Sequence, residues 1–362
     1  MLHILKEPPC PPELPGIIGD TEDAGGKYLR TLNNRVCRKS TRHFSRILSA
    51  MSTVLVSGSV AYDRIMDFPG LFKEHFIADK LHNINVSFAV EGFSENFGGT
   101  AGNIAYNLAL LGRTPRILAT VGSDFERYAE HLRSMKVDPT SIKTDLKAST
   151  SSAFIITDQA NNQIAAFSMA AGGTQYVPLP EKDGVLCAII GAGCVADMES
   201  LPSYYRSQGV EYFYDPGQQI SALSADQLRD GITNSRGLFV NDYELSLIIK
   251  KTGWDEAAIL KKTAALIVTL GEKGSRVLTA EGEHLVKAVP VAKVVDPTGA
   301  GDAYRAGFIV GFLSGARLER AAQVGSAVAA YAVEKYGTQN HGFTVVELSE
   351  RYKSAYGETL SL

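Results

Sequence analysis

The residues with the clearest chemical potential lie near the C-terminal end, in the segment 296–302 (DPTGAGD). The segment leads directly into a stretch of small and apolar residues, 303–312, which is typical of a buried helix. Gly299, Ala300 and Gly301 can present backbone N–H groups at the start of that helix, where unpaired donors and the helix dipole favour an anion. The Asp302 carboxylate comes next and suits removal of a proton from a hydroxyl group. The segment therefore predicts phosphoryl transfer, although glycine-rich turns before helices also occur without any such site.

A second glycine-rich segment, 97–103 (FGGTAGN), carries groups suited to a hydroxylated ligand. Gly98 and Gly99 let the backbone approach a ligand closely, and the Asn103 amide can bond hydroxyl groups. The G-x-G-x-x-G spacing is absent and we expect no strand immediately before the segment, so a dinucleotide site is disfavoured. Asp63 is expected just past the end of the first strand, where its carboxylate can accept hydrogen bonds from two neighbouring hydroxyls. A turn or capping role is the commoner use of such an Asp.

Two further motifs could serve a nucleotide. Asn241 and Glu244 place an amide and a carboxylate three residues apart on one helical face. Such oxygen ligands suit Mg²⁺ held through water beside phosphates, and the same pair is also good helix-capping chemistry. Thr269, Gly271 and Gly274 follow another strand in a turn where a nucleotide could lie against the backbone, or which simply closes a hairpin. No G-x-x-x-x-G-K-[ST] segment occurs, so a P-loop is excluded.

Taken together and in this order, the motifs resemble the ribokinase-like (PfkB) family of carbohydrate and nucleoside kinases over residues 51–362. The segments 98–103 and 296–302 are similar to the two signatures of that family. The resemblance implies that Asp302 is the catalytic base and that residues 299–301 form an anion hole. It implies further that sugar hydroxyls are bound by Asp63, Gly98, Gly99 and Asn103. ATP and Mg²⁺ are the implied cofactors, with ATP contacted by Asn241, Thr269, Gly271, Gly274 and Thr298, and Mg²⁺ organised through water by Asn241 and Glu244.

These motifs need an α/β scaffold to bring them together. From Met51 onward, short β-branched runs alternate with longer helical patterns, which predicts a mostly parallel central sheet flanked by helices. The expected core strands are 54–57, 116–121, 185–190, 212–215, 238–241 and 266–270, and the expected helices are 101–111, 126–135, 244–251, 303–312 and 318–334. Ligands of open α/β sheets collect beyond the carboxyl ends of the strands, where we expect the motifs to lie.

Two segments interrupt this alternation and predict a small β lid, from about 80–97 and 152–168. Ile84, Val86, Phe88 and Val90 recur with period two, and residues 153–157 can pair with 163–167 through a turn. A flap over the site would exclude water from phosphoryl transfer. An edge extension of the main sheet is the other interpretation.

Composition is that of an ordinary soluble protein. Of the 362 residues, 45% are hydrophobic and 21% are charged, and the formal net charge is −3, which argues against nucleic acid as a partner. No apolar run is long enough to span a bilayer, and the four cysteines form no metal or disulfide pattern, so a cytoplasmic protein is expected. Residues 1–50 are rich in proline and then in basic residues, and we expect a disordered or loosely ordered extension there, or an upstream start codon before Met51.

Within the family, the segments 59–63, 102–108 and 301–307, together with Gln339 to His341, look most like bacterial adenosine and broad-specificity nucleoside kinases. The resemblance thus implies transfer of the γ-phosphoryl group of ATP to the 5′-hydroxyl of adenosine. A base pocket could draw on Phe88, Phe97 or Phe167, although core packing is the commoner role of each. Two alternatives stay open: a kinase of ribose or a fructose phosphate, and a nucleoside-binding regulator without catalysis. The sequence also leaves open whether Arg305 assists the phosphates or pairs with a surface acid, whether His341 contacts ligand, whether a monovalent cation takes part, and whether the protein is a monomer or a homodimer.

Overall fold

The computed structural model describes residues 53–76, 85–160 and 162–362, and the predicted extension over residues 1–50 lies outside them. Residues Ala50–Leu362 form one compact unit. Its main sheet has eight strands in the order β14-β13-β12-β11-β10-β9-β1-β4. The strands are β1 (Thr53–Ser57), β4 (Thr114–Leu118), β9 (Val185–Ile190), β10 (Tyr212–Tyr214), β11 (Gly237–Asn241), β12 (Leu266–Thr269), β13 (Ser275–Thr279) and β14 (Gly282–Val286).

Pairing in this sheet is parallel from β4 to β12, and the pairs β12–β13 and β13–β14 are antiparallel. Successive side chains of a strand point to opposite faces, and each face is covered by helices. One apolar core contains Val54, Val56 and Phe239 and is covered by α2 (Thr100–Leu110), α3 (Glu126–Ser134), α8 (Ala300–Leu313), α9 (Leu318–Val333) and α10 (Val345–Tyr356). The other contains Leu55, Leu238 and Val240 and is covered by α4 (Val195–Gln208), α5 (Ala225–Ile232), α6 (Asp242–Thr252) and α7 (Glu256–Leu260). The predicted α/β architecture with a mostly parallel sheet is confirmed.

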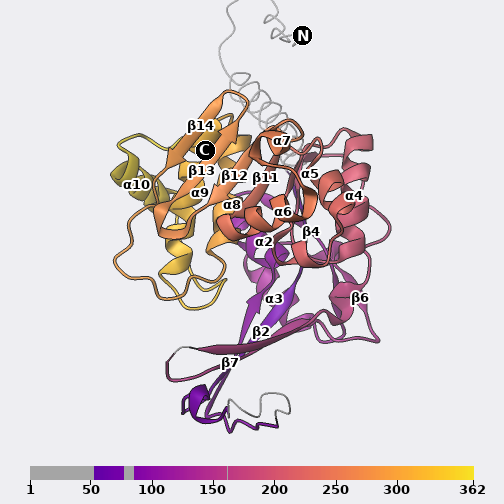
Figure 1. The fold of residues 1–362 in the computed structure, drawn as a ribbon, viewed down its shortest axis with the longest axis vertical. Helices are drawn as coiled ribbons and strands as arrows, with labels where there is room; N and C mark the ends of the chain where they lie inside the picture. The colour runs from indigo at the N-terminus through magenta and orange to yellow at the C-terminus, as the bar shows by residue number, and fades with distance from the viewer. Residues whose placement is uncertain (1–52, 77–84, 161) are drawn as a thin grey trace, which may run out of the picture. The chain divides into compact units, whose positions relative to one another are not determined.

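A second sheet of four strands, in the order β3-β2-β7-β8, extends away from the main sheet in Figure 1. Its strands are β2 (Ala61–Asp67), β3 (Gly92–Gly98), β7 (Ser151–Thr157) and β8 (Gln163–Ser168). We call this sheet the lid. The predicted hairpin of 153–157 with 163–167 is present as β7 and β8. The short strands β5 (Thr120–Gly122) and β6 (Lys143–Asp145) pair in parallel. Both lie in the chain between β4 of the main sheet and β7 of the lid.

The expected strand around Ile84 to Val90 is wrong. Residues 85–90 form no strand, Ile84 lies outside the described residues, and the strand lies further along at Gly92–Gly98. The Phe88 ring instead packs edge-on against Phe68 and Phe72, with ring centroids 4.9 and 5.1 Å away. The apolar period in this segment therefore reflects loop packing. The expected strand 116–121 is likewise divided, with β4 in the main sheet and β5 in the short pair.

The five predicted helices are present as α2, α3, α6, α8 and α9, with small differences at their ends. Among the described residues, none of the helices combines the length and the apolar character needed to cross a membrane. The carboxyl ends of β10, β11 and β12 and the start of α8 then carry the polar motifs described next.

Candidate active site

The start of α8 is built as the sequence predicts. Gly299 is the residue before the helix and has φ +76°, a left-handed conformation that favours glycine. Asp296 holds the preceding turn, because its Oδ1 accepts from the Thr298 amide at 2.9 Å and its Oδ2 from the Gly337 amide at 3.0 Å. The first amides of a helix have no partner within the helix and can bind an anion, although the Ala300 amide here donates to the Pro297 carbonyl oxygen at 3.3 Å.

The Asp302 side chain lies in the first turn of α8 and accepts a hydrogen bond from Asn103 Nδ2 at 2.8 Å. It is half-buried. Burial raises the pKa of Asp302 to about 7, and the Arg305 guanidinium and the Asn103 amide only partly oppose this effect. The carboxyl group therefore exchanges a proton near neutral pH, as a general base must.

Asp63 approaches the same place from the lid. It is the third residue of β2 and pairs with Asn96 of β3, so the expected position just past a strand end is wrong. The adjoining Gly98 ends β3, and a β-carbon on it would overlap the Asp63 carboxylate. A strand therefore does precede the segment 97–103, contrary to expectation, but it is an antiparallel lid strand rather than part of a dinucleotide-binding unit. Burial, and after it the charge of Asp296, raises the pKa of Asp63 to about 6.

Gly99 joins the lid strand β3 to α2 and is required by space. Its φ is +86°, and a β-carbon there would lie 2.5 Å from the Ser59 carbonyl oxygen. Asn103 is one turn into α2 and almost wholly buried. The turn from β3 into α2 thus fixes the distance between the lid carboxylate Asp63 and the Asn103 amide.

Asn241 and Glu244 form a capping box at the start of α6. Asn241 Oδ1 accepts from the Glu244 amide at 2.7 Å, and Glu244 Oε2 accepts from the Asn241 amide at 2.8 Å. Capping leaves the second carboxylate oxygen of Glu244 for another partner, and burial raises the pKa of that group. No cluster of three or more metal-ligating side chains occurs in residues 53–76, 85–160 and 162–362. One carboxylate beside an open cavity fits Mg²⁺, which keeps most of its water and phosphate ligands.

The predicted nucleotide turn is the hairpin between β12 and β13. Thr269 ends β12 and donates its hydroxyl to the Val240 carbonyl at 3.3 Å. Gly271 and Gly274 have φ +59° and +93°. A β-carbon at Gly274 would overlap the Val286 carbonyl oxygen, whereas nothing lies within 4 Å of one at Gly271. Gly274 therefore shapes the turn, while Gly271 leaves its outer side open.

These motifs meet around one cavity of about 610 Å³. Among the predicted site residues, its lining includes Asp63, Gly99, Asn103, Asn241, Glu244, Thr269, Gly271, Thr298, Gly299, Gly301 and Asp302. Gly98, Ala300 and Gly274 lie in the same turns but are not among the lining residues. Phe167 and Ala153 of the lid also line it, and Phe167 is 50% exposed. Phe97, in contrast, stacks on His131 with centroids 4.2 Å apart.

Sequence reasoning missed Asp215, which lines the cavity just after β10. Its Oδ1 accepts a hydrogen bond from Arg305 Nη2 at 2.6 Å, and its Oδ2 forms an ion pair with Arg305 Nε at 2.5 Å. Arg305 therefore pairs with an acid that is 1% exposed, rather than with the surface acid considered from the sequence. A β-carbon at Gly301 would lie 2.7 Å from Arg305 Nη1, which places the guanidinium directly beneath the anion-binding turn. An Asp at the carboxyl end of a core strand was the available signal.

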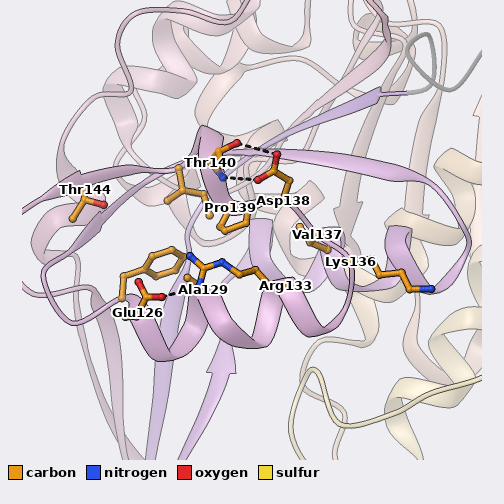
Figure 2. Close-up of a pocket in the computed structure, with 11 residues that line it drawn as sticks. Glu126, Ala129, Arg133, Lys136, Val137, Asp138, Pro139, Thr140 and Thr144 are labelled. Atoms are coloured by element: carbon orange, nitrogen blue, oxygen red, sulfur yellow. Dashed lines mark hydrogen bonds and ion pairs between the residues drawn. The ribbon is translucent and has the colours of Figure 1, made fainter. Parts of the chain in front are cut away.

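A separate hollow of about 510 Å³ lies beside α3 (Figure 2). Its lining includes Arg133, Lys136 and Asp138, and the Asp138 carboxylate caps the Thr140 amide at 2.9 Å. None of its lining residues belongs to the predicted site.

Comparison with known proteins agrees with the motifs. Residues 52–343 match the profile of the pfkB family carbohydrate kinases. A nucleoside kinase of Methanocaldococcus jannaschii is 30% identical over 285 residues, which are 77% of this chain and 93% of that protein. A nucleoside kinase of Methanothermobacter thermautotrophicus is 31% identical over 314 residues, covering 84% of this chain and 96% of that protein. The structure of a Burkholderia thailandensis nucleoside kinase in complex with inosine has a TM-score of 0.77 and 35% identity, covering 84% of this chain and 99% of that one.

The family match spans both predicted signatures, 98–103 and 296–302. Enzymes of this family are phosphotransferases that act on hydroxyl groups, as the segment 296–302 predicts. The chain belongs to the pfkB family of carbohydrate kinases.

Proposed function

We propose that this chain is an ATP-dependent nucleoside kinase that transfers the γ-phosphoryl group to the ribose 5′-hydroxyl, with adenosine as the expected substrate. The observation that carries the proposal is a row of three side chains across the lid. Asp63 pairs with Ala153 of β7, and Ala153 pairs with Phe167 of β8, so the three lie side by side on one face. All three line the cavity.

This row matches the two halves of a nucleoside. The Asp63 carboxylate can accept hydrogen bonds from ribose hydroxyls, and Asn103 lines the same cavity. Ala153 and the half-exposed Phe167 offer an apolar surface next to that carboxylate, on which a nucleobase can lie. A free sugar would leave this surface uncovered. The inosine complex of the similar Burkholderia thailandensis enzyme supports a purine nucleoside.

In the proposed reaction, Asp302 takes the proton of the 5′-hydroxyl as the oxygen attacks the γ-phosphorus of ATP, and ADP leaves. The amides at residues 299–301 stabilise the charge on the transferring group. Thr298, the hairpin turn at Thr269, Gly271 and Gly274, and Asn241 hold the nucleotide. Mg²⁺ would be held through water by Glu244 and Asn241, where it neutralises phosphate charge. Closure of the lid over the nucleoside would exclude water that otherwise hydrolyses ATP.

An ADP-release screen tests the proposal. Purified protein is incubated with Mg²⁺-ATP and adenosine, inosine, guanosine, cytidine, ribose or fructose 6-phosphate. We expect the highest kcat/KM with a purine nucleoside. Phosphorylation of ribose or fructose 6-phosphate alone would replace the proposal by a sugar kinase, and nucleoside binding by calorimetry without ADP would replace it by a regulator.

A pair of lid variants tests the base surface. Phe167→Ala should raise KM for the nucleoside by about tenfold, because one aromatic stacking partner contributes about 1–3 kcal/mol. Phe154→Ala is the matched control, since Phe154 is 39% exposed on the neighbouring strand but points to the opposite face of the lid. Equal effects of the two substitutions would remove the base surface from the proposal.

A further inference from the structure

A line of buried amide side chains links Asp302 to the C-terminal segment. Asn103 Nδ2 donates to Asp302 at 2.8 Å. Asn103 Oδ1 in turn accepts from Gln339 Nε2 at 3.0 Å. The same Gln339 nitrogen donates to the Tyr128 hydroxyl at 2.6 Å, and Gln339 Oε1 pairs with His131 Nε2 at 3.0 Å. Gln339 is 4% exposed, and Tyr128 is wholly buried.

A single backbone carbonyl determines the direction of every bond in this line. The Tyr128 hydroxyl lies 2.8 Å from the Gly98 carbonyl oxygen, which can only accept. The Tyr128 hydroxyl hydrogen is therefore donated to the Gly98 carbonyl oxygen. The Tyr128 hydroxyl oxygen must then accept a hydrogen bond from its other neighbour, the Gln339 side-chain amide. That neighbour has to be the amino group of Gln339, so the Gln339 amide can be oriented in one way only.

The same logic passes from Gln339 to the active site. With the first amino hydrogen of Gln339 on Tyr128, the second is donated to Asn103 Oδ1. Asn103 can then present only its own amino group to Asp302. At the other end, Gln339 Oε1 needs a donor, which is His131 with a proton on Nε2. Burial lowers the pKa of His131, which agrees with a neutral ring protonated at that nitrogen.

Asp302 is surrounded by positively and negatively charged groups, and Asn103 is an uncharged group that donates a hydrogen bond to it. Arg305, on the same helix, favours the ionised carboxylate. Asp215, after β10, and Asp63, on the lid, disfavour it, and burial does so most strongly. A hydrogen bond donated to a buried carboxylate favours its charged form. The orientation of one amide therefore affects how readily Asp302 loses its proton.

We infer that Gln339 is a positioning residue of the phosphoryl transfer, which holds Asn103 as a hydrogen-bond donor to Asp302. The inference rests on the proposed function, in which Asp302 is the general base. Gln339 lies outside the lining of the cavity and acts only through Asn103. Its role is to keep the base ionised at neutral pH.

Two substitutions at Gln339 should shift the acid limb of the pH profile of kcat, which is the fall of kcat at low pH, toward higher pH. Gln339→Leu removes the donor to Asn103 Oδ1, so the Asn103 amide can turn and the bond to Asp302 is partly lost. Gln339→Glu keeps the shape but can only accept, which turns the Asn103 amino group away from Asp302 and adds a negative charge. We expect the acid limb to move upward by about one pH unit for Gln339→Leu, and further for Gln339→Glu.

The pH profile separates positioning from simple damage. At pH 9, where Asp302 is ionised in every variant, kcat should return to within about threefold of the unmodified protein. Tyr106→Phe is the control, because the Tyr106 hydroxyl donates to the His341 carbonyl and so also ties α2 to the C-terminal segment without entering the amide line. Its acid limb should stay in place. An unmoved acid limb in Gln339→Leu, or an equal loss of kcat at every pH, would overturn the inference.

A second measurement makes the inference independent of the activity. The Asp302 carboxyl carbon, labelled with ¹³C and assigned by its loss in Asp302→Asn, is titrated by NMR without substrate. The pH midpoint of this titration should rise in Gln339→Leu and stay unchanged in Tyr106→Phe. If the unmodified protein produced no ADP from any acceptor, the proposed function would fail, while this titration would still decide whether Gln339 orients Asn103. An unchanged midpoint in Gln339→Leu refutes that orientation.

Discussion

Activity should depend steeply on pH, because two carboxyl groups of the cavity titrate close to neutrality. The pKa of Asp302 is raised to about 7 and that of Asp63 to about 6, in both cases mainly by burial. A carboxyl group with a raised pKa is protonated at a higher pH than usual, so its function is lost as the pH falls. In the proposed reaction, Asp302 must be ionised to accept the hydroxyl proton, and Asp63 must be ionised to accept hydrogen bonds from both ribose hydroxyls.

The size of the effect follows from these two values. Between pH 8 and pH 6 the ionised fraction of Asp302 falls from about 90% to about 10% and that of Asp63 from about 99% to about 50%, so kcat/KM for the nucleoside should fall about 20-fold. Between pH 6 and pH 5, Asp302 contributes about another ninefold and Asp63 about fivefold, which together give a fall of about 50-fold. The logarithmic profile should therefore steepen from a slope near one to a slope near two.

The assay measures initial rates of ADP formation by chromatography from pH 5 to pH 9, with limiting nucleoside, saturating Mg²⁺-ATP and constant ionic strength. Asp63→Asn should keep the limb near pH 7 and lose the steeper part. Asp302→Asn should lower kcat by about 10² to 10⁴ and remove the limb near pH 7. A flat profile from pH 8 to pH 6, or an unchanged limb in Asp302→Asn, would refute Asp302 as the base.

Three further predictions concern stability. Asp302→Asn should stabilise the ligand-free protein at pH 8 by about 2 kcal/mol, less than the full pKa difference implies because the carboxyl opens on the cavity. The gain should fall as the pH falls and be largely lost by about pH 4, close to the unfolded pKa, and equal urea midpoints at pH 8 would contradict this. Gly274→Ala should lower the free energy of unfolding by more than about 2 kcal/mol, against about 1 kcal/mol for Gly271→Ala, since only the former overlaps backbone; calorimetry ranks the two. Asp215→Ala should cost about 3–5 kcal/mol by leaving the Arg305 charge unpaired, and a double-mutant cycle with Arg305→Met should recover part of that loss.

The parts of the site that depend on local geometry could be predicted from the sequence. The turn at Gly299 and the position of Asp302 follow from the start of one helix, and the Asn241 to Glu244 pair is likewise decided within one helical turn. The place of Asp63 within a strand could not be predicted, because the β2 sequence AYDRIMD does not alternate polar and apolar residues and most of its residues are only partly buried.

The long-range partners could not be predicted. Arg305 meets Asp215 from 90 residues away, and Gln339 meets Asn103 from 236 residues away. A single polar residue near a helix or at a strand end has many possible partners, and only the packed fold selects one. Phe167 could be proposed for the base surface, but the sequence could not distinguish it from Phe88 and Phe97. All three are phenylalanines, which most often pack in a hydrophobic core.

The lid described above has a consequence for engineering. In the proposed reaction the acceptor is bound by Asp63, Ala153 and Phe167 of the lid strands together with Asn103 of α2, whereas Asp302 and the turn at Gly299 belong to the body around the main sheet. On the proposed function, the lid residues would therefore influence the choice of acceptor more than the phosphoryl transfer itself. A library confined to exposed cavity-facing positions of β7 and β8 should therefore alter which alcohol is phosphorylated while leaving the nucleotide half of the enzyme, and the core that stabilises it, unchanged.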